Sequence, residues 1–114
     1  MPRYAGAVRS VGTSAAATSQ TVSSSATVAE KIRMVTVKYS ASASVTVTIT
    51  LNSGAGAGYD TLLQNITLSS ATDGVWIPDG DLTLRAGDKI DVLCPSGGGA
   101  ITSACAIYTQ TRGD

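Results

Sequence analysis

The residues of this chain that could do chemistry are few, and no histidine is among them. Without histidine there is no general base of the commonest kind, no usual zinc ligand and no Ser-His or Cys-His nucleophile pair. Most acidic residues lie in or beside turn-forming sequences, where carboxylates cap backbone amides or face water. Asp79 and Asp81 flank Gly80, and a plain turn accounts for them better than a calcium site. We therefore predict a non-enzymatic protein with no metal site and no cofactor.

The two cysteines, Cys94 and Cys105, flank the turn-forming sequence Pro-Ser-Gly-Gly-Gly. If Asp88–Cys94 and Ile101–Gln110 form a hairpin about that turn, the two sulfur atoms lie too far apart for a bridge across it. Each cysteine also belongs to an alternating apolar set, which favours two small buried thiols. A disulfide is the main alternative, and a metal site would need ligands that the chain lacks.

The elements around these residues have the period of β-strands. In the sequence SVTVTITL, the residues Val45, Val47, Ile49 and Leu51 alternate with threonines. Successive side chains of a strand point to opposite faces, so this segment has one buried face and one wet face.

Short segments of the same kind follow one another from residue 31 onward, separated by turn-forming sequences. The predicted strands are Ile32–Tyr39, Ser44–Leu51, Thr61–Leu68, Gly74–Ile77, Leu82–Arg85, Lys89–Cys94 and Ile101–Thr109. Turns are expected at residues 40–43 and 69–74, and Gly87 is expected in a left-handed conformation. No segment has a convincing helical period, so the prediction is an all-β fold, a single antiparallel β-sandwich.

Composition limits the class of protein further. The 114 residues suffice for one domain, and 43% are hydrophobic, but there is no Phe and only one Trp. Few large rings make a thin core, which a partner subunit often completes. The formal net charge of zero argues against nucleic acid and membranes as partners. The N-terminal residues lack the apolar core of a signal peptide, so Sec export is not indicated.

Residues 1–30 differ from the rest and are rich in Ser, Thr and Ala. Substantial apolar side chains are few there and include Tyr4, Val11, Val22 and Val28. Such a segment buries too little to order itself alone. We predict an N-terminal arm over residues 1–30, lying along a neighbouring subunit, and a β-sandwich domain over residues 31–114. A leader with no role is the alternative.

The segment DGVWIPDGDLTLRAGDKIDVLC, from Asp73 to Cys94, resembles small jelly-roll subunits. Together with SVTVTITL and TLLQNITLSS it is similar to the head decoration (cement) proteins of tailed bacteriophages. The resemblance covers Lys31 to the C-terminus. It implies a jelly-roll sandwich that acts through extended contact surfaces, with no catalytic residues. Similar patterns also occur in trimeric host-recognition heads and in tail proteins.

The expected function is that of a virion structural protein, a capsid decoration subunit made in the host cytoplasm and placed on the capsid surface. Its partners would be the lattice of the major capsid protein and further copies of itself, as a trimer or dimer. The alternative is a tail, fibre or adhesion module that binds a host glycan or protein. Trp76 is either a core anchor or an interface residue. The candidate interface residues are Tyr4, Val11, Val22, Val28, Tyr59 and Trp76.

Overall fold

The part of the chain that the structure describes contains seven strands and one short 3-10 helix, joined by loops. The structure is a computed structural model that describes residues 8–16, 19–26, 28–79, 82–98 and 100–111, with the side chains of residues 8–16 and 111 outside that description. The elements in chain order are β1 (Val8–Ala16), β2 (Gln20–Ser25), β3 (Glu30–Asn52), η1 (Ala57–Tyr59), β4 (Thr61–Trp76), β5 (Thr83–Leu84), β6 (Lys89–Cys94) and β7 (Thr102–Thr111). All strand pairs are antiparallel, so the predicted all-β fold is confirmed.

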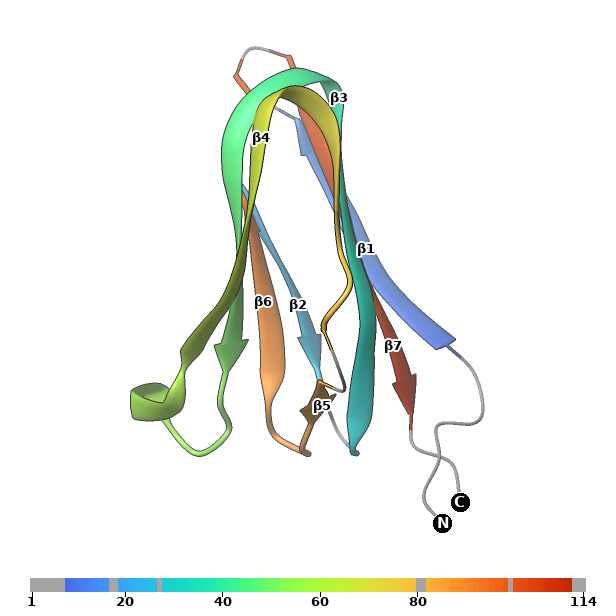
Figure 1. Cartoon of the computed structure of the whole chain (residues 1–114), viewed down its shortest axis with the longest axis vertical. Coiled ribbons are helices and arrows are strands. Elements are labelled where there is room, and N and C mark those ends of the chain that lie inside the picture. The colour runs from blue at the N-terminus through green and yellow to red at the C-terminus, as the bar shows by residue number, and fades with distance from the viewer. Residues whose placement is uncertain (1–7, 17–18, 27, 80–81, 99, 112–114) are drawn as a thin grey trace.

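A long hairpin of β3 and β4 builds both layers of the sandwich (Figure 1). The part of β3 from Glu30 to Tyr39 pairs with β7, and the part from Thr48 to Asn52 pairs with β6. Strand β4 runs beside β3 along both parts. The first layer therefore contains β1, β7, the beginning of β3, the end of β4 and β5. The second layer contains β2, β6, the end of β3 and the beginning of β4.

Both strands of this hairpin bend at sequences that were predicted to be turns. Residues 40–43 and 69–74 remain within β3 and β4, so four predicted strands merge into two. The β3–β4 register shifts at the bend, and Ser70 has a positive φ of 50°. Ser44 Oγ accepts a hydrogen bond from the backbone N–H of Ser70 at 3.1 Å. A short hydroxyl side chain thus satisfies a backbone donor at the bend, and pairing continues from one layer into the other.

The Ser/Thr/Ala-rich region before residue 31 contributes two strands to the sheet. Strand β1 pairs with β7 along its whole length, and β2 pairs with β6 along its whole length. The described sandwich thus begins at β1, before the boundary at residue 31 that composition predicts. Hydrogen bonds to an existing strand edge order such a segment even though it buries little apolar area.

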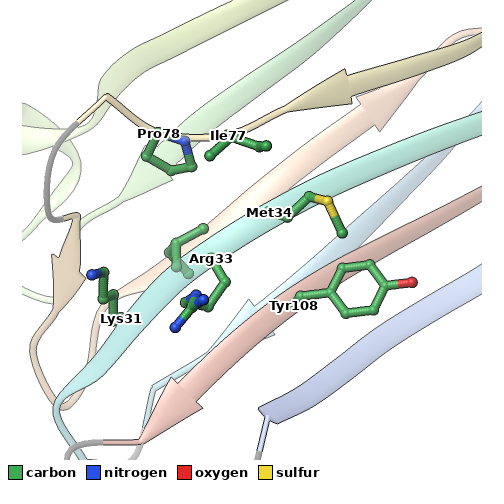
Figure 2. A pocket seen from close by; sticks show the side chains of 7 residues that line it. Lys31, Arg33, Met34, Ile77, Pro78 and Tyr108 are labelled. Carbon is green, nitrogen blue, oxygen red and sulfur yellow. The ribbon is translucent and has the colours of Figure 1, made fainter. Parts of the chain in front are cut away.

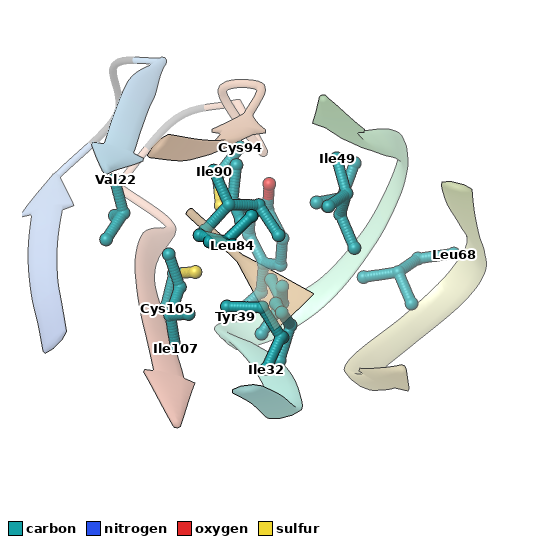
Figure 3. Close-up of a cluster of buried hydrophobic side chains, with 14 of the residues drawn as sticks. Val22, Ile32, Tyr39, Ile49, Leu68, Leu84, Ile90, Cys94, Cys105 and Ile107 are labelled. Carbon is teal, nitrogen blue, oxygen red and sulfur yellow. The ribbon is translucent and has the colours of Figure 1, made fainter. Parts of the chain in front are cut away.

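The core lies between the two layers (Figure 3). Val47 and Ile49 are both fully buried, while Thr46 between Val45 and Val47 is exposed, so the period-two prediction for this segment is confirmed. The buried apolar residues are Val22, Ala26, Ile32, Val35, Val37, Tyr39, Ala43, Val47, Ile49, Leu68, Leu84, Ile90, Val92, Cys94, Cys105 and Ile107. Every buried side-chain N or O atom in the described residues has a hydrogen-bond partner.

The turn between β5 and β6 holds the loop between β3 and β4. Gly87 has a φ of 95°, which confirms the left-handed conformation predicted for it. Asp88 Oδ2 accepts from the N–H of Arg85 at 3.2 Å, and Asp88 Oδ1 accepts from the N–H of Gly54 at 2.8 Å. One carboxylate therefore joins two loops at this end of the sandwich.

The backbones of these two loops are so close that Gly54 has no room for a side chain. A Cβ at residue 54 would lie 2.6 Å from the carbonyl oxygen of Gly87. We expect Gly54→Ala to lower the free energy of unfolding by about 1–3 kcal/mol, because backbone must shift to relieve the overlap. Chemical denaturation measures the effect. Gly58→Ala is the matched control, since a Cβ there meets nothing within 4 Å. Equal stabilities of the two variants would contradict the close approach.

Candidate interaction surface

The residues predicted to form an interface do not gather in one place. Val22 is 2% exposed and packs in the chain's own core, because β2 pairs with β6 and turns this side chain inward. Trp76 is half-buried and packs against the same core. Val28 and Tyr59 are exposed, one between β2 and β3 and the other in η1. Tyr4 and the side chain of Val11 lie outside the described part of the chain.

A different apolar surface lies on the outer side of the first layer. The register places Met34 opposite Tyr108, and Thr36 opposite both Val75 and Ala106. Val75 is 58% exposed and Ile77 is 66% exposed, while Trp76 between them packs inward. The first-layer face, as we call this surface, consists of Met34, Val75, Ile77, Ala106 and Tyr108.

The first-layer face is hollowed at one end, where β4 leaves the sheet. A cavity of about 520 Å³ lies there, open to solvent and lined by Ile77 and Pro78 on one side and by β3 and β7 on the other (Figure 2). Lys31, Arg33, Met34 and Tyr108 line it as well. Arg33 is held by a hydrogen bond of 2.6 Å from Nη1 to Gln110 Oε1. The apolar hollow thus has two cationic side chains at its rim.

A second exposed feature is the free edge of β4. In the described part of the chain this strand pairs only with β3. No charged residue and no proline occurs between Asp60 and Asp73. Leu62, near the start of the strand, is 55% exposed. Strand edges without charge or proline are templates for pairing with another strand.

The carboxylates at the loop end of the sandwich are engaged in holding the loops. Asp60 Oδ1 accepts from the N–H of Ser53 at 2.8 Å, and Asp91 Oδ2 accepts from Asn52 Nδ2 at 3.2 Å. No group of three or more His, Cys, Asp or Glu side chains in the described residues is arranged to hold a metal ion. The Asp79–Asp81 turn lies partly outside the described residues.

Polar groups at the other end of the core join the two layers. Tyr39 Oη donates to the carbonyl oxygen of Pro95, directly after β6, at 2.6 Å. Gln20 Nε2, on β2, donates to the carbonyl oxygen and the Oγ of Ser103, on β7, at 3.0 and 2.7 Å. These bonds tie the end of the second layer to the first layer.

Tyr39 is expected to make the free energy of unfolding fall at alkaline pH. Burial raises the pKa of Tyr39 to about 12, with smaller Coulombic contributions from Cys94 and Cys105. The folded state holds this proton more tightly than the unfolded chain, so the stabilisation is complete below about pH 10 and is lost as the pH rises to about 12. We expect a loss of about 1–3 kcal/mol from this group. Between about pH 10 and pH 12, the free energy of unfolding should fall more steeply with pH for the native chain than for Tyr39→Phe. Parallel curves for the two proteins would contradict the raised pKa of Tyr39.

The sequence carried a signal for the first-layer face that composition did not reveal. Val75, Trp76 and Ile77 are consecutive, so a strand places Trp76 on one face and both neighbours on the other. Once Trp76 packs inward, Val75 and Ile77 must point outward. Met34 and Tyr108 lie on the same face as Val75 and Ile77 because β3 pairs with both β4 and β7. That strand order cannot be predicted from the local sequence.

The fold and these surfaces define a class of protein: an all-β sandwich with an exposed apolar sheet face and an edge strand that carries no charge from Thr61 to Thr72. No family model matches the chain, and no curated protein matches it. No helix in the described residues is long and apolar enough to cross a membrane.

Proposed function

We propose that this chain is a non-enzymatic structural protein of a virus particle, a decoration or cement subunit on the head of a tailed bacteriophage. The sandwich would be of the jelly-roll kind. The observation that supports this proposal most strongly is the first-layer face, on which Val75 and Ile77 are exposed beside Met34 and Tyr108. Exposed apolar patches on a small sandwich favour a function in contact with another protein.

The partner we propose is the lattice of the major capsid protein. Lys31 and Arg33 at the rim of the hollow favour a partner surface that is apolar at its centre and acidic at its edge. Docking removes the exposed valine and isoleucine from water, and binding to the assembled lattice stabilises that lattice by mass action. Many copies on one particle multiply a modest gain per copy.

We propose that copies of the chain also associate with one another, as dimers or trimers, and that the free edge of β4 favours the dimer. Two copies of the uncharged part of β4, from Thr61 to Thr72, can pair antiparallel without opposing like charges, and Leu62 gains an apolar neighbour. The subunits would be made in the host cytoplasm and end on the capsid surface.

Quantitative mass spectrometry of purified particles from the source tests this function by counting copies of the chain per particle. Hundreds of copies would support a head-decorating subunit. A handful of copies would indicate a component of the tail or fibre instead. Absence of the chain from the particle would refute the virion function.

The alternative is a tail, fibre or adhesion module that binds a host glycan or protein. The hollow beside Tyr108 favours it, because an aromatic ring and two cationic side chains are common features of sites for acidic sugars. Binding of sialylated or sulfated glycans, lost in Tyr108→Ala, would support this alternative over capsid decoration.

A further inference from the structure

Cys94 and Cys105 lie in one core although they belong to different layers. Cys94 ends β6 and is 0% exposed, and Cys105 on β7 is 3% exposed. Strand β6 pairs with β2 and β3, whereas β7 pairs with β1 and β3, so the predicted hairpin of β6 and β7 does not form. The connection after Cys94 crosses from the second layer to the first. The two sulfur atoms are therefore not held apart by the geometry of such a hairpin.

Hydrogen bonds from two side chains, Gln20 and Tyr39, place the cysteines at the same level of the sandwich. Gln20, opposite Cys94 in the β2–β6 register, donates to Ser103, which lies two residues before Cys105 on the same side of β7. Tyr39, opposite Ser103 in the β3–β7 register, donates to the carbonyl oxygen of Pro95 next to Cys94. Each cysteine thus lies within two residues of a contact that joins the layers.

The two thiols are in contact with each other. Hydrogen bonding between the Cys94 and Cys105 side chains is the largest influence on the pKa of each thiol. Figure 3 shows both side chains in the space between the layers, among the buried apolar residues. That hydrogen bond and burial raise the pKa of the Cys105 thiol, whereas the same hydrogen bond lowers the pKa of Cys94. Cys94 is therefore the first of the two to become a thiolate.

We propose that Cys94 and Cys105 form a disulfide that locks the two layers together when the protein meets a small disulfide oxidant. In the first step the thiolate of one cysteine attacks the oxidant, and a mixed disulfide forms as one small thiol leaves. In the second step the other cysteine, after giving its proton to solvent, attacks the protein sulfur of that mixed disulfide, and the second small thiol leaves with a proton. The protein loses two electrons and two protons, and the oxidant is reduced to two thiols.

The rate of this reaction is set by access to the pair. Thiolates are the nucleophiles, and burial covers both sulfur atoms so that an oxidant cannot reach them in the closed structure. Opening of the connection after Cys94, which Tyr39 holds through Pro95, precedes the first step. The cross-link closes a short loop between residues 94 and 105, and it stabilises the fold mainly by restricting the unfolded chain.

Thiol counting on the full chain tests the proposal. The reduced protein is incubated with excess oxidised glutathione at mildly alkaline pH, in one sample as the folded protein and in another during refolding from denaturant. Both samples are then unfolded, alkylated with iodoacetamide and weighed by intact mass spectrometry. We expect a monomer without alkyl or glutathione adducts, lighter by two hydrogen atoms, with a melting temperature raised by roughly 10 °C over the reduced form.

Cys94→Ser and Cys105→Ser are the controls, and each should keep one thiol or carry one glutathione, with no rise in melting temperature. An internal bond formed in either sample of the native chain, with that rise, supports the proposal. Two alkylated thiols or glutathione adducts in both samples, a bond only between chains, or an internal bond without a rise in melting temperature would overturn it. None of these outcomes depends on the capsid function.

Discussion

Ile107→Ala is expected to lower the free energy of unfolding by about 2–5 kcal/mol. Ile107 is 0% exposed and lies on β7, the strand between β1 and β3 in the first layer. Its side chain faces the second layer across a core that contains no phenylalanine. A thin core has few bulky neighbours that could move into the cavity left by the lost atoms, so we expect a cost in the upper part of that range. The free energy of unfolding of a small domain is only about 5–15 kcal/mol in total, so this single change removes a large fraction of it.

Ile77→Ala is the matched control for this variant. It removes the same atoms from a side chain that is 66% exposed, on the outer side of the same layer. Urea denaturation followed by Trp76 fluorescence measures both variants, and we expect Ile77→Ala to remain within about 0.5 kcal/mol of the native chain. Similar losses for the two variants would contradict the assignment of inner and outer faces in the first layer.

The fold class and much of the core follow from periodicity alone. Alternation identifies Val47 and Ile49 as inward-facing, and it does the same for Ile90 and Val92. These predictions hold because one face of a strand in a two-layer sandwich must be dry. The alternation can therefore be recognised from the sequence of one strand, without knowledge of which strand is its neighbour.

The sequence predicts where the β3–β4 hairpin bends, but it does not predict that these sites are bends within continuous strands instead of turns. Residues 40–43 and 69–74 are small or polar, which local reasoning interprets as turns. In the structure they are bulged bends within continuous strands, stabilised by contacts such as Ser70 N–H to Ser44 Oγ. That donor and acceptor are distant in sequence. The difference between a turn and a bend is therefore a tertiary property.

The relation of the two cysteines failed to emerge from the sequence for the same reason. A glycine-rich connection between two strands predicts a hairpin, because neighbouring strands usually pair. Here the beginning of β3 pairs with β7 and its end pairs with β6, so β3 separates β6 from β7 in the strand order. The candidate interaction surface likewise depends on strand order, since β3, β4 and β7 each contribute to the first-layer face.

Ile77→Glu is expected to weaken binding to the capsid lattice by roughly 30-fold or more, the effect of removing an interface hot spot. The carboxylate replaces an apolar side chain at the mouth of the hollow, beside the cations Lys31 and Arg33. It would have to be desolvated when the surface docks, and it would neutralise the charge that we propose is complementary to the partner. Both effects act on the complex and leave the free subunit folded.

Co-sedimentation with particles that lack the chain measures this loss, and thermal unfolding of the free variant verifies that the fold is intact. Leu93→Glu is the control, because Leu93 is also a partly exposed apolar side chain, at 42%, but it belongs to β6 in the second layer. Loss of binding in Ile77→Glu alone would assign docking to the first-layer face. Loss in Leu93→Glu alone would move the contact to the second layer, and equal loss in both would point to the added charge itself. Undiminished binding in both variants would contradict docking through the first-layer face.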